Sequence, residues 1–405
     1  MPGLQGKRIL LGVTGSIAAY KAAEWVRLLV KEEAIVTVVM TRAAERFVSP
    51  LTFSALSGNQ VYRDMFDDQP DGVMAHIALS READVILVAP ATAQTIARLG
   101  SGFADDLLST VILAAGIPVV VCPAMNSNML AHPATQQNIN RLQQFGYHLV
   151  RSDSGSLACG ETGDGRLPDW DVAREALLTL FEPNDLKDRK VLITAGPTRE
   201  PLDPVRFLSN RSSGKMGFSL ARTAQRRGAE VTLVTGPVCL ADPPGIEVIR
   251  VATAVEMEEM VMQRASAVQV IVKSAAVADF RPAAYQNHKI KKTSQGLQLA
   301  LVKNTDILSK LGENRIQGQV LVGFAAESRD HVGEGQRKFQ EKNLDLIVVN
   351  DILGTQTGFD VETNQVTLID RKGSAVLPLL TKEATANRIW DKVVSLLQEE
   401  DVDAS

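Results

Sequence analysis

Short runs of Val, Ile and Leu alternate along this chain with longer segments in which apolar residues recur every three or four positions. In the first part of the chain the apolar runs cover residues 8–13, 35–40, 84–89 and 117–122. The segments between them predict helices over residues 17–30, 49–56, 92–99 and 105–115. Apolar strands that alternate with helices are typical of a parallel sheet covered on both faces. The pattern therefore predicts an α/β domain.

The same pattern begins again near residue 190. A short apolar run over residues 191–194 leads into a loop with Gly196 and Pro197, and a basic, Ser-rich segment precedes a helix that opens at Gly217. The N-terminus has the same order, because residues 8–13 lead through Thr14-Gly15-Ser16 into a helix. Strand, small-residue loop and helix form the start of an α/β nucleotide-binding unit. We therefore predict two Rossmann-like domains in series, over residues 1–189 and 190–405.

The second domain contains more than parallel strands. Further strands are predicted at residues 231–234, 247–251, 268–273, 320–324 and 344–349, with a charged helix over 330–343 and a terminal helix over 382–400. Residues 288–293 and 297–302 predict a two-stranded flap, and the alternation over 361–379 predicts an antiparallel addition to the sheet. In the first domain, residues 152–166 are rich in glycine and predict a mobile loop.

Composition narrows the function classes. The chain has 405 residues, of which 45% are hydrophobic and 22% charged, and its net charge of -4 gives no electrostatic reason to expect nucleic acid or an anionic membrane as a partner. The longest nearly apolar run, residues 111–125, contains Gly116, Pro118 and Pro123 and is too short to span a bilayer. The three cysteines form no CxxC pair. We therefore expect a cytoplasmic protein with free thiols.

The glycine loops do not match the common nucleotide-binding motifs. Gly12-Val13-Thr14-Gly15 lacks the third glycine of GxGxxG, although the helix that follows it could offer N–H groups to a phosphate. The segment 209–216 contains Gly-Lys, but Met216 stands where a P-loop requires Ser or Thr. A plain tight turn explains the first loop equally well.

Three residues of the first half are candidates for chemistry. Cys159 lies among glycines, where a thiol could deliver a proton over a closed site, whereas Cys122 ends an apolar strand and reads as a small buried side chain. Asn126 follows a strand at the edge where α/β sheets bind ligands, and it could anchor a carboxylate or simply form a turn. His76 follows a polar loop, and a structural histidine is its ordinary interpretation.

Cationic residues are the candidates of the second half. Lys289 lies on the predicted flap, and Lys338 and Lys342 share one face of a helix because they are four residues apart. Asp279 follows a strand that ends near Ala275, again at the ligand-binding edge. Each is unremarkable alone, but together with Arg206 these cations could neutralise a triphosphate, with Asp279 assisting ribose or metal binding.

Over essentially its whole length the chain resembles the bacterial bifunctional phosphopantothenoylcysteine decarboxylase/phosphopantothenate–cysteine ligases of coenzyme A biosynthesis. The first half shares Gly-Ser-Ile-Ala-Ala-Tyr-Lys (15–21), Pro-Ala-Thr-Ala (90–93), Ala-Asp-Asp-Leu-Leu (104–108), Pro-x-Met-Asn-x-x-Met (123–129) and Ala-Cys-Gly (158–160). The second half shares Ala-Gly-Pro-Thr-Arg-Glu (195–200), Ser-Asn-Arg-Ser-Ser-Gly-Lys-Met-Gly (209–217), Ala-Ala-Val-Ala-Asp (275–279) and Gly-Phe-Ala-Ala-Glu (323–327). The chain departs from the family at Leu130, where Trp is usual, and at Gln94, where Asn is usual.

For the second half, the resemblance implies a ligase that uses CTP, Mg²⁺, 4′-phosphopantothenate and L-cysteine and passes through an acyl-cytidylate. It implies that Lys289 stabilises the transition state and that Asn210 positions the acyl group. It assigns Arg206 to the substrate phosphate and leaves the metal ligands unknown. The implied CTP contacts are Ala275, Asp279, Lys289, Asn304, Thr305, Asp306, Ile307, Phe324, Lys338 and Lys342.

For the first half, the resemblance implies a decarboxylase that uses FMN to oxidise the cysteine thiol, so that the resulting thiocarbonyl accepts the electrons left by CO₂. It implies that His76 is the base or carboxylate partner, that Asn126 binds the substrate carboxylate, and that Cys159 donates the final proton. The implied FMN contacts are Gly15, Ser16, Ile17, Thr41, Thr92 and Asp105.

The family also implies a homo-oligomer, a dodecamer in which decarboxylase trimers are joined by ligase dimers. Two other functions compete with this interpretation. Relatives of the decarboxylase fold include proteins that regulate a phosphatase, but the presence of His76, Asn126 and Cys159 together argues against that role. A generic NAD(P)-linked reductase is disfavoured because GxGxxG is absent.

Overall fold

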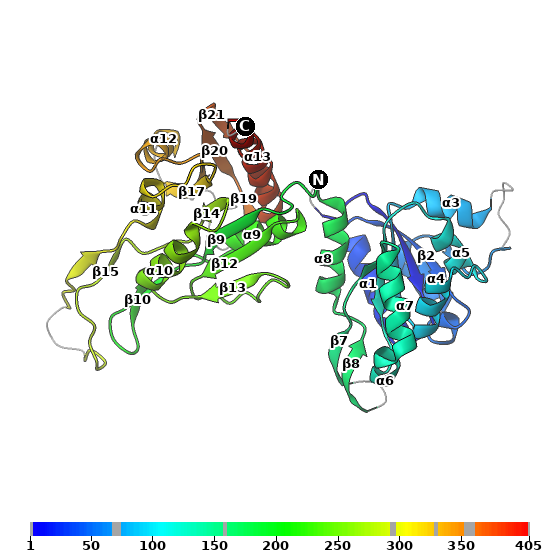
Figure 1. Cartoon of the computed structure of the whole chain (residues 1–405). Helices are drawn as coiled ribbons and strands as arrows, with labels where there is room; N and C mark the ends of the chain where they lie inside the picture. Colours follow the sequence, from blue (N-terminus) through cyan, green and yellow to red (C-terminus); the bar gives the residue numbers. More distant parts are fainter. Residues whose placement is uncertain are drawn as a thin grey trace. The chain divides into compact units, whose positions relative to one another are not determined.

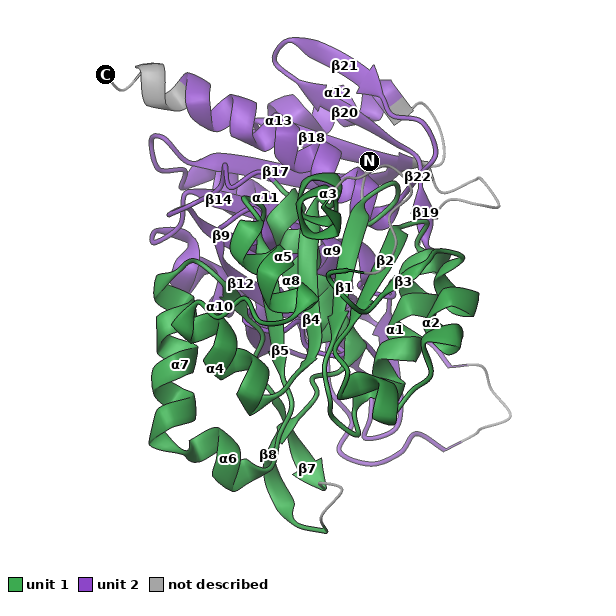
Figure 2. Cartoon of the chain, turned by 90° about the vertical axis from the view of Figure 1, so that its right-hand side faces the viewer, with its two compact units in different colours: residues 1–182 green, residues 183–405 purple. Residues whose placement is uncertain are grey.

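The computed structural model describes residues 3–66, 74–156, 160–291, 297–327, 331–351 and 361–403 (Figure 1). The chain forms two compact units, Met1–Glu182 and Pro183–Ser405, which are coloured separately in Figure 2. The boundary expected between residues 189 and 190 falls inside the second unit. The reason is that Leu186 is completely buried in the core of that unit and Asp185 forms an ion pair with its Arg227.

A parallel sheet forms the centre of the first unit. Its strand order is β3-β2-β1-β4-β5-β6, so the order reverses between β1 and β4. The strands are β1 (Arg8–Val13), β2 (Ile35–Met40), β3 (Val61–Tyr62), β4 (Val85–Ala91), β5 (Val119–Pro123) and β6 (His148–Leu149). The helices are α1 (Ala19–Lys31), α2 (Pro50–Ser57), α3 (Ala75–Glu82), α4 (Ala93–Ser101), α5 (Leu107–Ala114), α6 (Ser127–Ala131), α7 (Pro133–Gln144) and α8 (Trp170–Phe181).

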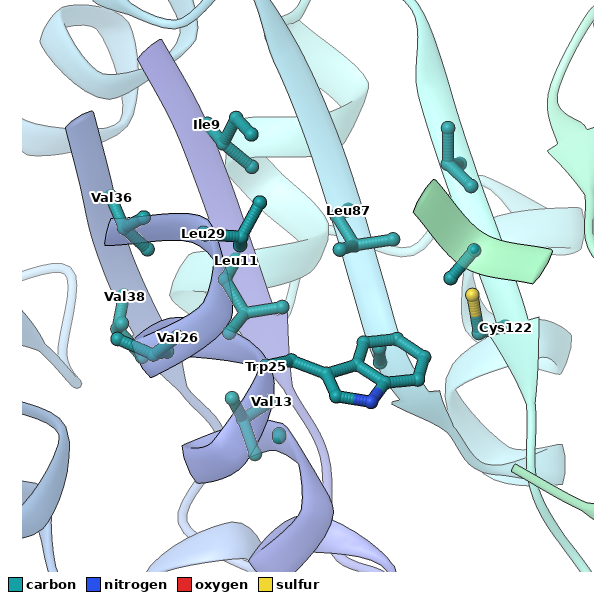
Figure 3. Close-up of a cluster of buried hydrophobic side chains, with 14 of the residues drawn as sticks. Ile9, Leu11, Val13, Trp25, Val26, Leu29, Val36, Val38, Leu87 and Cys122 are labelled. Carbon is teal, nitrogen blue, oxygen red and sulfur yellow. The ribbon is translucent and has the colours of Figure 1, made fainter. Parts of the chain in front are cut away.

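Helices cover both faces of this sheet, because side chains of a strand point alternately to its two sides. Figure 3 shows one face, where Leu11 and Val13 of β1 lie near Trp25 of α1 and Ile9 lies further along the strand. Helices α1, α2 and α8 bury their apolar sides there, and α3, α4, α5 and α7 do so on the opposite face with Leu10. The predicted α/β class is therefore confirmed for this unit.

Residues 152–166 differ from the mobile loop that the glycines suggested. They include an antiparallel hairpin, β7 (Asp153–Ser156) and β8 (Thr162–Arg166). Cys159 falls between these strands, outside the described residues. The hairpin was missed because Asp, Ser and Gly have low strand propensity, whereas the pairing depends on backbone hydrogen bonds.

The second unit contains an eight-stranded sheet of order β13-β12-β9-β14-β17-β18-β20-β21. It is parallel as far as β18 and antiparallel beyond. The strands are β9 (Lys190–Ala195), β12 (Glu230–Thr235), β13 (Glu247–Arg250), β14 (Val270–Lys273), β17 (Val320–Glu327), β18 (Leu346–Asp351), β20 (Val366–Asp370) and β21 (Gly373–Val376). The helices are α9 (Lys215–Arg226), α10 (Ala254–Ala265), α11 (Ile307–Glu313), α12 (His331–Glu341) and α13 (Lys382–Asp403).

Two layers of helices enclose this sheet as well. Helices α9 and α13 cover one face, and α10 and α11 cover the other. Trp390 of α13 is completely buried, and its indole N–H donates to Leu220 O and Thr223 Oγ1 of α9. The antiparallel addition predicted over residues 361–379 is confirmed by β20 and β21.

The predicted flap is wrong in its pairing. Residues 288–291 form no strand, residues 292 and 293 of the predicted first strand lie outside the described residues, and β16 (Leu301–Lys303) pairs instead with β15 (Phe280–Pro282). Alternation of apolar residues indicates a strand but does not identify its partner, which explains the error. Short pairs also join β10 (Arg199–Pro201) to β11 (Phe207–Ser209) and β19 (Thr363–Asn364) to β22 (Leu380–Thr381). Among the described residues, no helix is both long and apolar enough for a membrane span.

Candidate functional site

A hydrogen-bonded junction fixes the carboxyl ends of β1 and β4, where the strand order of the first unit reverses. The hydroxyl of Thr14 donates to Pro90 O at 2.6 Å and accepts from Thr92 N at 3.1 Å. Thr92 in turn caps α4, because its Oγ1 accepts from Thr95 N at 3.3 Å. The first turn of α4 is therefore held at the edge where open α/β sheets bind ligands.

Gly15 follows directly and approaches a neighbouring loop very closely. A Cβ at this position would lie 2.4 Å from the Cβ of Ala43. Only glycine allows the loops after β1 and β2 to pack this tightly. The sequence pattern alone could not separate this close approach from a plain turn.

A cavity of about 800 Å³ opens at this junction. Its volume is that of a typical cofactor site. Five of the six residues expected to contact FMN line this cavity, namely Gly15, Ser16, Thr41, Thr92 and Asp105. Gln94 lines it as well. Three arginines that sequence analysis did not single out also line it, namely Arg42, Arg63 and Arg98.

Arg98 is bound to the two acidic residues beside it. Its guanidinium lies 3.1 Å from Asp105 Oδ2 and 2.7 Å from Asp106 Oδ2. Asp106 also caps α5, since its carboxylate accepts from Ser109 N at 2.8 Å. The pairing orients Asp105 at the cavity wall, and the two carboxylates offset the charge of the guanidinium.

A second cavity of about 480 Å³ contains Asn126 and Ile17, together with Tyr20, Lys21 and Arg166. Asn126 caps the short helix α6, because its Oδ1 accepts from Asn128 N at 2.9 Å, while its Nδ2 donates to Glu161 Oε2 at 2.9 Å. The position of Asn126 is therefore compatible with both interpretations: it forms a turn at the start of α6, and it lines a cavity where it could bind a carboxylate. Ile17 and Tyr20 are 57% and 61% exposed.

The other two catalytic candidates of the first half are not placed in these cavities. His76 is partly buried in the first turn of α3, and it does not belong to the described residues that line either cavity. Cys159 lies outside the described residues, so its role stays a prediction.

In the second unit, side chains from β9 and the loop after it hold the segment 275–278 in place. Thr194 Oγ1 accepts from Ala275 N at 3.2 Å, and Thr198 Oγ1 accepts from Ala278 N at 3.0 Å. Asn210 donates to the carbonyl oxygens of Ala276 and Val277 at 3.3 and 3.0 Å. These bonds shape the ligand-binding edge between β9 and β14, where the strand order of this sheet reverses.

This edge forms a cavity of about 410 Å³. The structure gathers there six of the residues predicted for the ligase half, which are Asn210, Ala275, Asp279, Phe324, Lys338 and Lys342. Cations dominate the lining, since Arg211, Lys215, Lys273, Lys338, Lys342 and Lys382 accompany Asp279 as the only carboxylate among the described lining residues. Such a surface favours polyanionic ligands.

Lys273 is one of the cavity residues that sequence analysis missed. It ends β14, and its Nζ donates to Ala275 O at 3.2 Å. Burial, together with the charges of Lys342 and Lys338, lowers the pKa of Lys273 to about 8 against the opposing effect of Asp306 and Asp279. The available signal was a lysine at the end of the apolar run Val270-Ile271-Val272, directly before the Ala-rich loop.

Arg206 and Lys289 lie elsewhere. The Arg206 guanidinium donates to Asp203 Oδ2 at 2.8 Å and to Ile290 O at 2.9 Å. Lys289, next to Ile290, is exposed and does not belong to the described lining of the cavity. The structure therefore gives Arg206 an internal role that the sequence did not indicate.

The segment 304–307 supports the cavity and does not line it. Asn304 is buried, and its Nδ2 donates to Ala278 O at 2.8 Å. Asp306 caps α11 and accepts from Lys342 Nζ at 2.7 Å, while Ile307 is buried and Thr305 is exposed. Burial alone would raise the pKa of Asp306, but hydrogen bonds from Lys342 and Ser309 N hold it below its ordinary value.

Family models match each half of the chain. Residues 3–180 match the model described as Flavoprotein, and residues 186–397 match the C-terminal domain of the DNA/pantothenate metabolism flavoproteins. Together with the two ligand-binding edges, these matches define a two-domain protein in which a flavoprotein domain precedes a pantothenate-metabolism domain.

Full-length relatives identify the family further. The chain is 44% identical to the "Coenzyme A biosynthesis bifunctional protein CoaBC" of Bacillus subtilis, over 97% of this chain and 98% of the relative. It is 45% identical to the protein of that name from Escherichia coli, over 98% of each chain. A crystal structure of the C-terminal domain of such a protein is 40% identical and has a TM-score of 0.47, covering 53% of this chain and 99% of that one. The chain belongs to the family of bifunctional coenzyme A biosynthesis proteins.

Proposed function

We propose that this protein converts 4′-phosphopantothenate to 4′-phosphopantetheine in two steps of coenzyme A biosynthesis. The second unit couples 4′-phosphopantothenate to L-cysteine at the expense of CTP, and the first unit decarboxylates the product with FMN. The observation that carries this proposal is the match of both halves, in one chain, to bifunctional relatives over almost their whole length.

The ligase step must overcome charge repulsion. A carboxylate is a poor electrophile, so its oxygen attacks the α-phosphorus of CTP, pyrophosphate leaves, and an acyl-cytidylate forms. Both partners are anions, and the cationic lining of the second unit's cavity neutralises them. Asp279, Phe324, Lys338 and Lys342 hold CTP, with Mg²⁺ carried on its phosphates.

Other residues act on the acyl group. Asn210 orients it, because the side chain lies at the cavity wall beside the carbonyls of Ala276 and Val277. Lys289 stabilises the charge that develops as the cytidylate forms. Arg206 binds the phosphate of the substrate, which requires it to contact the ligand while remaining close to Asp203.

The decarboxylase step takes place in the first unit. The cavity there fits FMN, because the close approach at Gly15 leaves backbone exposed to a ligand and the first turn of α4 offers N–H donors to a phosphate. Gly15, Ser16, Ile17, Thr41, Thr92 and Asp105 are the residues that hold it. Bound FMN supplies the two-electron oxidation of the substrate thiol and its later reversal.

The chain itself positions the substrate and its protons. Asn126 binds the substrate carboxylate through Nδ2, exchanging its bond to Glu161 for one to another carboxylate. His76 acts as the base or carboxylate partner during loss of CO₂, and Cys159 donates the proton to the product carbon. These three roles follow the family pattern.

We further infer a dodecamer, built from decarboxylase trimers joined by ligase dimers. Apolar side chains on the surface of the first unit support an assembly, since Ile17, Tyr20, Leu51 and Phe103 are each more than half exposed. Light scattering on the purified chain tests this, and a monomer at micromolar concentration would contradict it.

One experiment tests both activities. Purified protein is mixed with 4′-phosphopantothenate, L-cysteine, CTP and Mg²⁺, and the products are identified by mass spectrometry. We expect 4′-phosphopantetheine, CMP and pyrophosphate. A reaction that stops at phosphopantothenoylcysteine would contradict the decarboxylase assignment alone, and the absence of any product would contradict both.

A further inference from the structure

Two asparagines and two lysines lie together in the cavity of the second unit, and the roles described above give the asparagines no function and the lysines only a share in the positive charge of the lining. They are Asn350 of β18, Asn364 of β19, Lys215 of α9 and Lys382 of α13, and we call them the amide–lysine cluster. The same cavity contains Asn210 and Asp279. A ligand on the cluster would therefore share one space with the acyl group and the nucleotide.

The asparagines present acceptors that are not used. Asn350 Oδ1 and Asn364 Oδ1 are shielded from solvent, and neither has a hydrogen-bond partner within the described part of the chain. Asn364 is only 2% exposed, and its Nδ2 contacts Met216 Sδ at 4.0 Å. Because buried carbonyl oxygens are normally paired, two unpaired ones on residues that line a cavity indicate a ligand that brings N–H or O–H donors.

The lysines add positive charge beside these acceptors. Lys382 is 4% exposed, and its Nζ donates to the carbonyl oxygens of Val361 and Thr363. Lys215 forms an ion pair with Glu362, whose side chain is 79% exposed. The cluster thus combines buried neutral acceptors with two ammonium groups.

We propose that the amide–lysine cluster binds the amino-acid co-substrate of the ligase, with its amine on the two Oδ1 atoms and its carboxylate near Lys215 and Lys382. The inference rests on the proposed ligase function. CTP and 4′-phosphopantothenate are polyanions, and the cations around Lys273, Lys338 and Lys342 suit them. The amino acid is the one substrate with both an aliphatic amine and a carboxylate, which matches this mixture of acceptors and ammonium groups.

The arrangement also suits the chemistry of amide formation. The uncharged amine attacks the acyl carbon, a C–N bond forms, and the C–O bond to CMP breaks with its electron pair leaving on the phosphate oxygen. The nitrogen then releases one proton to solvent. Two carboxamide oxygens that accept two N–H bonds leave the nitrogen lone pair free to attack, and they hold the amine in one orientation.

The half-reaction that precedes cysteine gives a sharp test. Exchange of labelled pyrophosphate into CTP, dependent on 4′-phosphopantothenate and without cysteine, reports formation of the acyl-cytidylate. We expect Asn364→Leu and Asn350→Leu to leave this exchange within about twofold of wild type. Each should raise KM for cysteine about tenfold or more, because one hydrogen bond to the substrate is lost.

Controls and contrary results are well defined. Asn314→Leu changes an exposed asparagine at the end of α11 and should alter neither quantity. If exchange falls in the cluster variants while melting temperature and circular dichroism stay normal, the cluster serves CTP or Mg²⁺, and the proposal is wrong. A rise in KM for 4′-phosphopantothenate in place of cysteine would equally overturn it.

The role of the lysines is tested with cysteamine, which is cysteine without the carboxylate. Wild type should prefer cysteine in kcat/KM, and Lys382→Met should lower kcat/KM for cysteine about tenfold while leaving cysteamine unchanged. Arg388→Met, at an exposed position of the same helix, is the matched control. Should Lys382→Met fail to fold, Lys215→Met gives the same test at a less buried site. An unchanged preference for cysteine contradicts the proposal.

Wild-type behaviour separates this inference from the proposed function. Absence of pyrophosphate exchange in the unmodified protein would refute the ligase assignment itself. Normal exchange and normal ligation in wild type, with cluster variants that keep their KM for cysteine, would refute only the amino-acid site.

Discussion

Asp203 and Arg206 form an ion pair of 2.8 Å in which the carboxylate is completely buried. The same carboxylate accepts from the backbone N–H groups of Val205, Arg206 and Ile290. Burial alone would raise the pKa of Asp203, but these N–H groups and the charge of Arg206 lower it to about 2. Since Ile290 follows Lys289, this pair anchors the segment that carries the proposed catalytic lysine.

Asp203→Asn should therefore impair ligation without touching the nucleotide cavity. We expect kcat of the ligase to fall about 10- to 100-fold, because small displacements of a catalytic group cost that much. KM for CTP should stay within about threefold of wild type. Limited proteolysis read by mass spectrometry should show faster cleavage within residues 283–291. Asp242→Asn, which breaks a surface pair with Arg250, is the control, and equal kcat in both variants would disprove the anchoring role.

Lys273 predicts that nucleotide binding depends on pH. Its pKa of about 8 lies below the ordinary lysine value, so the folded protein loses this proton at a lower pH than the unfolded chain does. A triphosphate favours the charged form, so CTP should bind with proton uptake near pH 8. Its affinity should be constant below pH 7 and fall above pH 8, by at most about tenfold per pH unit.

Calorimetry in buffers of different ionisation enthalpy measures this uptake. Lys273→Met should bind CTP about tenfold more weakly at pH 7 and lose the uptake, whereas Lys303→Met, at an exposed position of β16, should behave as wild type. The contribution of Lys273 to the stability of the fold changes with pH in the opposite direction to its contribution to CTP affinity. Because the folded pKa is lowered, Lys273 destabilises the fold at neutral pH and this effect disappears between pH 8 and 10.5, so Lys273→Met should raise the melting temperature at pH 7. Identical uptake in Lys273→Met and wild type would rule out Lys273 as its source.

The sequence predicted the parts of this fold that depend on hydrophobic periodicity. Buried strands such as residues 8–13 and 191–194, and the helix over Trp170–Phe181, have enough apolar residues to show their period. The hairpin around Cys159 and the pairing of β15 with β16 depend on backbone hydrogen bonds and tertiary partners, which leave no such period. Local sequence was therefore informative where burial dominates.

The candidate sites also divide into residues that the local sequence could place and residues that depend on tertiary contacts. Residues that follow strands, such as Asn126 and Asp279, could be placed at the ligand-binding edge, because parallel strands end together. Asn364 could not, since it reaches the cavity only through a two-residue strand far along the chain. The ion pair of Arg206 with Asp203 could not be predicted either, because it depends on the turn between β10 and β11.

Cys159 is expected to act after loss of CO₂, as the donor of the final proton. Cys159→Ser should therefore release CO₂ from phosphopantothenoylcysteine but accumulate the oxidised enethiol, two hydrogens lighter than 4′-phosphopantetheine. Mass spectrometry of the products measures this, and Cys239→Ser, at an exposed free cysteine, is the control. Normal 4′-phosphopantetheine output from Cys159→Ser would show that another group donates the proton.

Gly15 gives the most direct test of the cofactor cavity. Gly15→Ala places a methyl group 2.4 Å from Ala43 Cβ, so the loops after β1 and β2 must separate at the cavity wall. We expect a loss of about 1–3 kcal/mol in unfolding free energy, as is usual for overpacking. Bound flavin, measured as the ratio of 450 nm to 280 nm absorbance, should fall about tenfold. Gly116→Ala is a matched control, because a Cβ there meets no atom within 4 Å. If Gly15→Ala keeps its flavin and its stability, the loop after β1 does not define the cofactor site, and the assignments of Gly15 and Ser16 fail with it.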